Sequence, residues 1–159
     1  MQTPGEILHE SVSCGDCELD RGSGADRGRS CPFIVYRCAR DQLLCRVGDA
    51  ADHVWLVRHG AIGLTRSPAD ESGRGFTGEV DSLRLPGSYV GLECLLLDRY
   101  VYSARALSPS TVCRASREVF TAWLRQSHER VAEVMRRVLE ELVPEDVRPV
   151  SARGGRPEG

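Results

Sequence analysis

The chain has 159 residues, of which 41% are apolar and 28% are charged, a composition typical of one soluble globular domain. Its formal net charge of −2 excludes the strongly basic balance that draws a protein to nucleic acid through charge alone. No apolar run approaches the roughly 20 residues that a membrane helix needs, and residues 1–10 lack the basic and apolar pattern of a signal peptide. We therefore expect a cytoplasmic protein with no membrane association.

Residues 1–32 form a cysteine-bearing N-terminal segment. Within it, Arg21–Ser30 contains three glycines and no apolar side chain larger than that of Ala25. Such a stretch cannot bury enough surface to offset its ordering entropy, so by itself it should be poorly ordered. Cysteines nevertheless flank it. In a reducing compartment, cysteines are more often metal ligands or redox groups than disulfides, and their total of seven prevents complete pairing within one chain.

The following residues, up to about 114, show short strands separated by turns, which is typical of a sandwich or a closed roll. Apolar runs rich in β-branched and aromatic residues end at glycine, proline or polar clusters. The stretch Ser67–Gly78 is polar and contains glycine, so we expect an exposed loop there. The predicted strands are Phe33–Tyr36, Val54–Val57, Ala61–Thr65, Val80–Leu85, Tyr100–Leu107 and Thr111–Arg114.

The last third of the chain changes to a helical period. Ser116 is a favourable N-cap, with Glu118 in the first turn of the helix it would begin. A second helix is predicted from Ser127 to Val143 and stops at Pro144. Its apolar side chains recur at i, i+3, i+4, i+7 and i+11 and therefore form one stripe. The stripe consists of Val131, Val134, Met135, Val138 and Leu142.

Three segments together resemble the sensor domain of the CRP/FNR family of regulators. Leu44–Leu64 resembles the family's strand, Gly-Asp turn, strand, glycine and strand unit, in which Gly48 and Gly60 stand where tight turns demand a positive φ. Leu85–Leu97 resembles the Pro-Gly turn and the start of the phosphate-binding cassette. Tyr102–Phe120 resembles the exit strand of the cassette, the next hairpin and the helix after it.

The resemblance implies a fold that is mainly β with α: a double-stranded β-roll, a cyclic-nucleotide-binding-like jelly roll, followed by a C-terminal dimerisation helix. On this division, residues 33–126 are the β-roll sensor domain and residues 127–144 the dimerisation helix. Residues 145–159 are rich in glycine and proline and are expected to be a disordered tail. We expect the chain to form a homodimer.

A cyclic nucleotide is not the expected ligand. Family members that bind one supply an arginine directly before Ser-Ala, because a guanidinium offers a phosphate both charge and paired donors. Here Tyr102 stands at that position, and Glu93 is shifted by one residue from the glutamate that would bind the ribose. Arg99 and Arg105 are near in sequence but do not occupy the same place. Losing the charged partner of a buried phosphate costs about 2–5 kcal/mol.

Four of the seven cysteines follow a ligand pattern. Cys14 and Cys17 form a C-x2-C pair, a spacing that zinc sites, redox pairs and iron–sulfur sites share. Cys31 stands directly before Pro-Phe, and Cys113 lies in a predicted strand. The set resembles the FNR branch of the family, which holds a [4Fe–4S] cluster through four thiolates. The resemblance implies a cluster bound by Cys14, Cys17, Cys31 and Cys113.

Thirteen residues separate Cys17 from Cys31, a longer spacer than the FNR branch has. The glycine-rich insert can span the distance, and the added loop entropy is under about 1 kcal/mol. Cys38 could replace Cys31 or Cys113 as a ligand, whereas Cys45 and Cys94 are expected to be buried as small hydrophobic residues. Arg114 and arginines of the N-terminal segment could offset part of the cluster's negative charge.

These patterns favour a regulatory sensor of oxygen, nitric oxide or redox state. Two alternatives stay open: a cluster-free module that binds a protein partner, and a structural domain stabilised by zinc. His53 and His59 lie near a turn and are expected to be solvated. No catalytic motif is present, so we expect no enzyme. The sequence after Pro144 holds no helix-turn-helix, so direct DNA binding is not expected, and any control of transcription would act through a partner protein or a second component.

Overall fold

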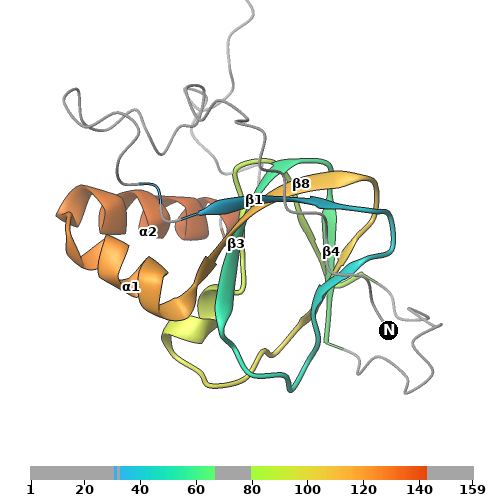
Figure 1. The fold of residues 1–159 in the computed structure, drawn as a ribbon, viewed down its shortest axis with the longest axis horizontal. Helices are drawn as coiled ribbons and strands as arrows, with labels where there is room; N and C mark the ends of the chain where they lie inside the picture. Colours follow the sequence, from blue (N-terminus) through green and yellow to red (C-terminus); the bar gives the residue numbers. More distant parts are fainter. Residues whose placement is uncertain (1–30, 32, 67–79, 143–159) are drawn as a thin grey trace, which may run out of the picture.

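The computed structural model describes residues 31, 33–66 and 80–142 of the chain. The described strands form two antiparallel sheets, with strand orders β1-β8-β3-β6 and β2-β7-β4-β5, that close into a roll (Figure 1). The predicted β-roll is therefore confirmed. The strands are β1 (Ile34–Cys38), β2 (Leu43–Cys45), β3 (His53–His59), β4 (Ile62–Thr65), β5 (Ser82–Arg84), β6 (Tyr89–Val90), β7 (Ser103–Ala106) and β8 (Ser110–Ser116).

The central strands of the first sheet, β3 and β8, are buried on both faces, and their register separates the two sets of side chains. Leu56 of β3 lies opposite Cys113 of β8 and Tyr89 of β6. Residues directly opposite each other in an antiparallel pair point to the same face. The Tyr89 ring lies 6.1 Å from that of Phe120 in the first helix, so this is the helix-covered face. The other face lines the interior of the roll and carries Trp55 against Tyr100.

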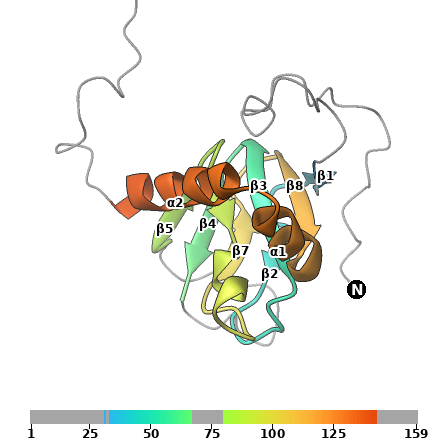
Figure 2. The same ribbon diagram turned by 90° about the vertical axis from the view of Figure 1, so that its left-hand side faces the viewer.

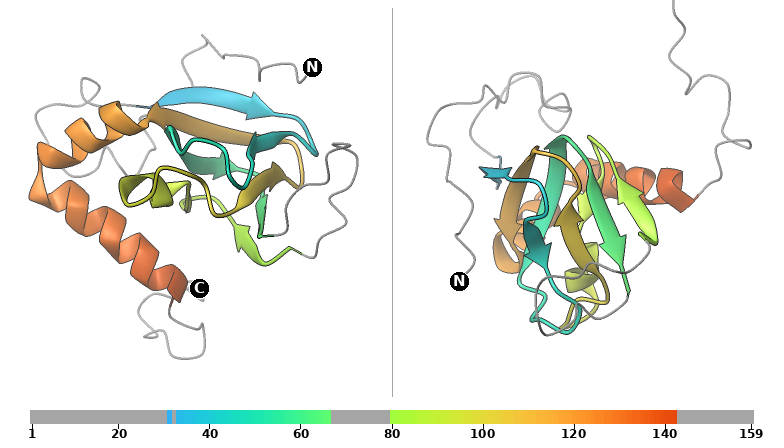
Figure 3. Two further views of the ribbon diagram at one scale, coloured as in Figure 1. Left: turned by 90° about the horizontal axis from the view of Figure 1, so that it is seen from below. Right: turned by 90° about the vertical axis from the view of Figure 1, so that its right-hand side faces the viewer.

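The helices follow β8 directly. Helix α1 (Arg117–Arg125) begins at the predicted cap, because the Ser116 hydroxyl accepts a hydrogen bond from the Val119 backbone N–H at 3.2 Å. Helix α2 (His128–Leu142) meets α1 at a corner and then runs back beside the roll (Figures 2 and 3). No helix in the described part of the chain is long and apolar enough to cross a membrane.

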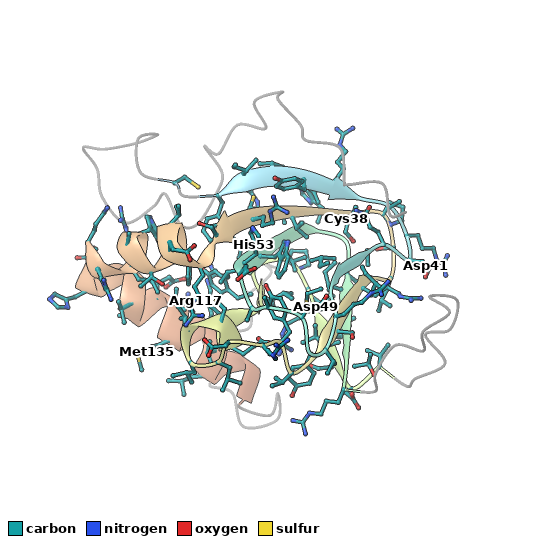
Figure 4. All side chains as sticks on the ribbon, turned by 60° about the horizontal axis from the view of Figure 1, so that its bottom comes forward. Cys38, Asp41, Asp49, His53, Arg117 and Met135 are labelled. Atoms are coloured by element: carbon teal, nitrogen blue, oxygen red, sulfur yellow. The ribbon has the colours of Figure 1, made fainter. Side chains whose placement is uncertain are left out.

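The apolar stripe of α2 is divided between two environments. Val134 is 6% exposed and belongs to the core, whereas the side chains of Val131, Met135 and Leu139 are exposed. These three residues are spaced by four, so they form a ridge along one side of the helix, which we call the α2 ridge. Figure 4 shows Met135 on the side of α2 that faces away from the roll. The single stripe expected from the sequence is thus a buried contact and a separate exposed ridge.

Several expectations fall outside the described residues: the N-terminal segment apart from Cys31, the predicted loop Ser67–Gly78, and the tail after Leu142. Gly48 and Gly60 have the predicted positive φ, at +86° and +85°. The structure adds β6 and a short 3-10 helix, η3 (Leu92–Leu95), neither of which was predicted.

Candidate functional site

Cys113 lies in the centre of the first sheet and on its helix-covered face. Its partners across the strands are Val35 in β1 and Leu56 in β3, and the residue is 4% exposed. Because side chains alternate along a strand, Phe33 lies on the same side of β1 as Val35 if the chain stays extended. Ring contacts support this placement, since the Phe33 centroid lies 5.8 Å from Phe120.

Cys31 is exposed and lies just before β1, at the end of that strand nearest to the helices. If the β1–β8 pairing continued backwards, Cys31 would be level with a residue four positions beyond Cys113, about 13 Å along the sheet. β1 begins at Ile34, however, so strand pairing does not fix Cys31 at that distance. Cys31 thus precedes the edge strand of the sheet that contains Cys113. Cys14 and Cys17 lie outside the described residues.

The other three described cysteines are in different places. Cys38 ends β1 opposite Ser110, far from the helices (Figure 4), and by alternation it points to the interior of the roll. Cys45 and Cys94 are 7% and 0% exposed, which confirms that they are buried. Cys38 is therefore badly placed to join Cys113 in one ligand set, because the two thiols lie on opposite faces of the sheet.

Burial also raises the pKa of these three thiols. Desolvation raises the pKa of Cys45 to about 12, with the Glu93 carboxylate adding to the effect. Burial raises the pKa of Cys94 to about 11, and it raises the pKa of Cys38 as well. All three thiols should therefore be protonated at neutral pH in the chain as described.

An aromatic cluster joins the helix-covered face to α1. The Phe120 ring is fully buried and lies 5.7 Å from Trp123 and 6.1 Å from Tyr89. Phe33 lies against both Phe120 and Trp123. A displacement of β1 or β6 would therefore reach α1 through direct ring contacts.

Tyr102 stands at the position where the resemblance predicts a phosphate-binding arginine, and it contacts Arg66. The Arg66 guanidinium lies over the Tyr102 ring, 5.1 Å from its centroid, and donates to the Tyr102 hydroxyl at 2.8 Å. The Ser103 hydroxyl accepts a hydrogen bond from the Val47 backbone N–H at 3.0 Å. Tyr102 and Ser103 are thus each hydrogen-bonded to another segment of the chain, Tyr102 to Arg66 and Ser103 to Val47.

His53 differs from the expectation of a solvated turn residue. It begins β3, is partly buried, and its backbone exchanges two hydrogen bonds with the Tyr100 hydroxyl, at 2.8 and 2.9 Å. Burial, followed by the positive charge of Arg114, lowers the pKa of its imidazole. His59 is exposed at the end of β3, as expected.

Arg114 also differs from its predicted role. Its guanidinium lies 4.4 Å from the centre of the Tyr36 ring and donates to the Tyr36 hydroxyl at 2.7 Å. By alternation along β8 it points to the opposite face from Cys113, so it is not placed to neutralise a cluster there. Within residues 31, 33–66 and 80–142, no group of three or more histidine, cysteine and acidic side chains could hold a metal. Two members of the four-cysteine set, Cys14 and Cys17, lie outside those residues.

The chain matches a known protein family along most of the roll. The family model described as cyclic nucleotide-binding domain matches residues 36–127, more than half of the chain. The chain belongs to the cyclic nucleotide-binding domain family. A comparison with curated proteins finds no match.

Solved structures share the fold of this cyclic nucleotide-binding domain. The N-terminal domain of a transcriptional regulator from Streptomyces coelicolor A3(2) is 20% identical, with a TM-score of 0.51 over 70% of this chain and 76% of that one. A cyclic nucleotide-binding domain from Methylobacillus flagellatus is 20% identical, with a TM-score of 0.54 over 70% and 60%. The catabolite activator protein of Thermus thermophilus is 22% identical, with a TM-score of 0.53 over 69% and 51%. The match thus spans about half the length of that activator.

Membership of the cyclic nucleotide-binding domain family does not restore the phosphate arginine. The residue before Ser103 is Tyr102, and the nearest guanidinium that the structure places beside it belongs to Arg66, at the end of β4. Arg66 already donates to the Tyr102 hydroxyl, so a phosphate would have to compete for it. The chain thus has the family fold, and Tyr102 stands at the position where the resemblance predicts a phosphate-binding arginine.

Proposed function

We propose that the chain is a CRP/FNR-type sensor domain in which Cys14, Cys17, Cys31 and Cys113 hold a [4Fe–4S] cluster. It would sense oxygen, nitric oxide or redox state and signal through a homodimer formed by α2 or through a partner protein. The observation that carries the proposal is the position of Cys113. This cysteine lies on the helix-covered face of the first sheet, the face against which Phe33 packs two residues after Cys31.

The donor set suits the group. Four thiolates satisfy the ligand demand of a [4Fe–4S] cluster, which supplies the reaction with oxygen or nitric oxide when it is bound. Cys31 precedes β1, the strand that pairs with β8 and Cys113, whereas Cys38 lies on the opposite face of that sheet and Cys45 and Cys94 lie in β2 and η3. Because Val35 shares the level of Cys113, the bound N-terminal segment would have to fold over this part of β1.

The residues around Cys113 provide a short route to the helices. Leu56 lies between Cys113 and Tyr89 in the sheet, and Tyr89 contacts Phe120 in α1. Phe33 adds a second contact from the chain next to Cys31. If Cys113 were a ligand of the cluster, a shift of this residue would be felt in β1 and β8, and the ring contacts would pass that shift to α1.

The α2 ridge supports self-association. Met135 is 57% exposed and Leu139 is 54% exposed, although both are large apolar side chains. Glu133, Arg136 and Glu140 form ion pairs beside the ridge, which leaves it as an apolar strip with a charged border. Such a strip on one helix suits packing against the same strip of a second copy.

Serine substitution of each cysteine tests the ligand set. Cys14→Ser, Cys17→Ser, Cys31→Ser and Cys113→Ser should each abolish or weaken iron binding after anaerobic reconstitution. The matched controls Cys38→Ser, Cys45→Ser and Cys94→Ser should keep the iron content of the unaltered chain. Iron loss in Cys38→Ser with retention in Cys113→Ser would refute the assignment. Zinc in place of iron would favour a zinc-stabilised structural domain, and a metal-free chain would favour the cluster-free binding module.

A further inference from the structure

Helix α2 contacts the roll through a buried arginine. The Arg137 side chain is 11% exposed, whereas that of the neighbouring Arg136 is 52% exposed. Arg137 Nη1 donates a hydrogen bond to the carbonyl oxygen of Gly87 at 2.5 Å. Gly87 lies in the turn between β5 and β6, so the contact joins the helix to a point fifty residues earlier in the chain.

Glu133 sets the direction in which the Arg137 guanidinium points. Its Oε1 atom accepts a hydrogen bond from Arg137 Nε at 2.9 Å and another from Arg136 Nη2 at 2.7 Å. These bonds, that of Arg136 first, keep the pKa of Glu133 below its usual range, so the carboxylate stays charged at neutral pH. A guanidinium presents its donors in a rigid planar fork. Because Glu133, one helical turn before Arg137, holds the Nε atom, the terminal Nη1 atom of Arg137 points at Gly87.

The turn is built to accept that approach. Gly87 has a φ of +94°, and a Cβ at this position would stand 2.8 Å from Arg137 Nη1. Any larger residue would be strained in its backbone and would collide with the arginine. The turn is also fixed to β3, since Gly87 N–H donates to Val57 O at 2.9 Å and Val57 N–H donates to Ser88 O at 3.0 Å.

The same turn leads into the functional part of the roll. Tyr89, two residues after Gly87, contacts Phe120 of α1 and lies opposite Leu56 in β3. Along α2, Val134 is buried three residues before Arg137, whereas Met135 and Leu139 beside them are exposed. Helix α2 thus contacts the roll through Val134 and Arg137, and Arg137 contacts the turn.

We infer that Arg137 is a positioning residue that sets the orientation of α2 against the roll, and that the Pro86–Gly87 turn passes changes in the roll to α2. The inference rests on the proposed function only in taking α2 as the signalling helix. Its structural half, the orientation of α2, is independent of any cluster. Rearrangement of β6 moves the Gly87 carbonyl, and the fixed fork of Arg137 turns α2 with it.

Hydrogen exchange measured by mass spectrometry on the full chain tests this coupling. Arg137→Met removes the fork and keeps most of the apolar stem. We expect exchange to rise about tenfold or more in two separate segments, residues 85–90 and residues 128–142, the factor that corresponds to losing a hydrogen bond from a charged donor. In the comparison variant Arg136→Met, which loses a partner of Glu133 but keeps the Arg137 fork, exchange of residues 85–90 should rise much less.

Two further variants keep the test decisive if Arg137→Met unfolds. Glu133→Gln keeps Arg137 but weakens its orientation, so the same two segments should loosen to a smaller extent. Arg137→Lys keeps the charge without the planar fork and should restore the turn only in part. Unchanged exchange of residues 85–90 in these variants, or an equal rise in Arg136→Met, would overturn the inference. A chain that binds no iron would leave these results as they are, so the two proposals fail separately.

Discussion

Replacing Phe120 by alanine should weaken the whole domain, because this ring links the sheet to the helices. Phe120 is fully buried and lies within 6.1 Å, centroid to centroid, of Phe33, Tyr89 and Trp123. Truncating a buried phenylalanine costs about 3–5 kcal/mol, the sum of lost transfer energy and the cavity left behind. Domains of this size are stable by about 5–15 kcal/mol, so Phe120→Ala should fold but only marginally.

Urea unfolding followed by tryptophan fluorescence measures the effect, since Trp123 lies in the same cluster. With a urea dependence of about 2 kcal/mol per molar, the midpoint should fall by about 1.5–2.5 M. Phe120→Leu should lose less than about 1.5 kcal/mol, because most of the volume is kept. Val119→Ala is the matched control: Val119 is 48% exposed on the same helix, and its loss should stay within about 0.5 kcal/mol. Equal midpoints for Phe120→Ala and Val119→Ala would refute the packing described for α1.

Three further predictions concern the dimer, the roll and His53. Met135→Glu combined with Leu139→Glu should give a monomer by light scattering, because both side chains are exposed on the α2 ridge, while Val119→Glu on α1 should not; an unaltered chain that is already monomeric contradicts the ridge as an interface. Calorimetric titration with cAMP or cGMP should show no heat of binding below roughly 100 μM, since the residue in the arginine position is Tyr102 and losing that partner costs about 2–5 kcal/mol; micromolar binding would overturn this. Burial and the charge of Arg114 lower the pKa of His53, so the unfolded chain takes up its proton first, and the stability from His53 is present above about pH 6.5 and lost as pH falls below it. His53→Gln should therefore flatten the fall in unfolding free energy on acidification, and an unchanged slope would show that His53 does not contribute.

The elements with strong local signals are those that the sequence predicts well. Ser116 caps α1 because a hydroxyl before a helical period satisfies an early backbone N–H. Gly60 takes a positive φ and lies so close to the Pro109 carbonyl that a Cβ would stand 2.8 Å away. The limits of α2, His128–Leu142, lie within one residue of the predicted helix.

Tertiary placement decides what the sequence could not predict. A helical period puts Val134 and Met135 in one stripe, but the position of the roll determines that the first is buried and the second exposed. β6 has only two residues, too few for any periodic pattern. Arg137 looks like one more surface charge until Gly87, distant in sequence, is placed beside it.

The candidate site shows the same division. The sequence pattern predicts that Cys113 lies in a strand. Neighbouring residues of β3 and β8 are buried on both faces of the sheet, so burial alone does not show which face Cys113 occupies. The register and the ring contacts supply that answer. They also remove Arg114 from the proposed cluster environment, because its guanidinium packs on Tyr36.

Iron and acid-labile sulfide analysis of the full chain, reconstituted anaerobically, tests the central claim most directly. The account predicts about four iron and four sulfide per chain, as a [4Fe–4S] cluster requires, with loss of both on exposure to air. It also predicts that Cys113→Ser, in the buried centre of β8, loses iron while Cys94→Ser, buried in η3, retains it. Reconstituted chain that contains no iron would contradict the iron–sulfur sensor.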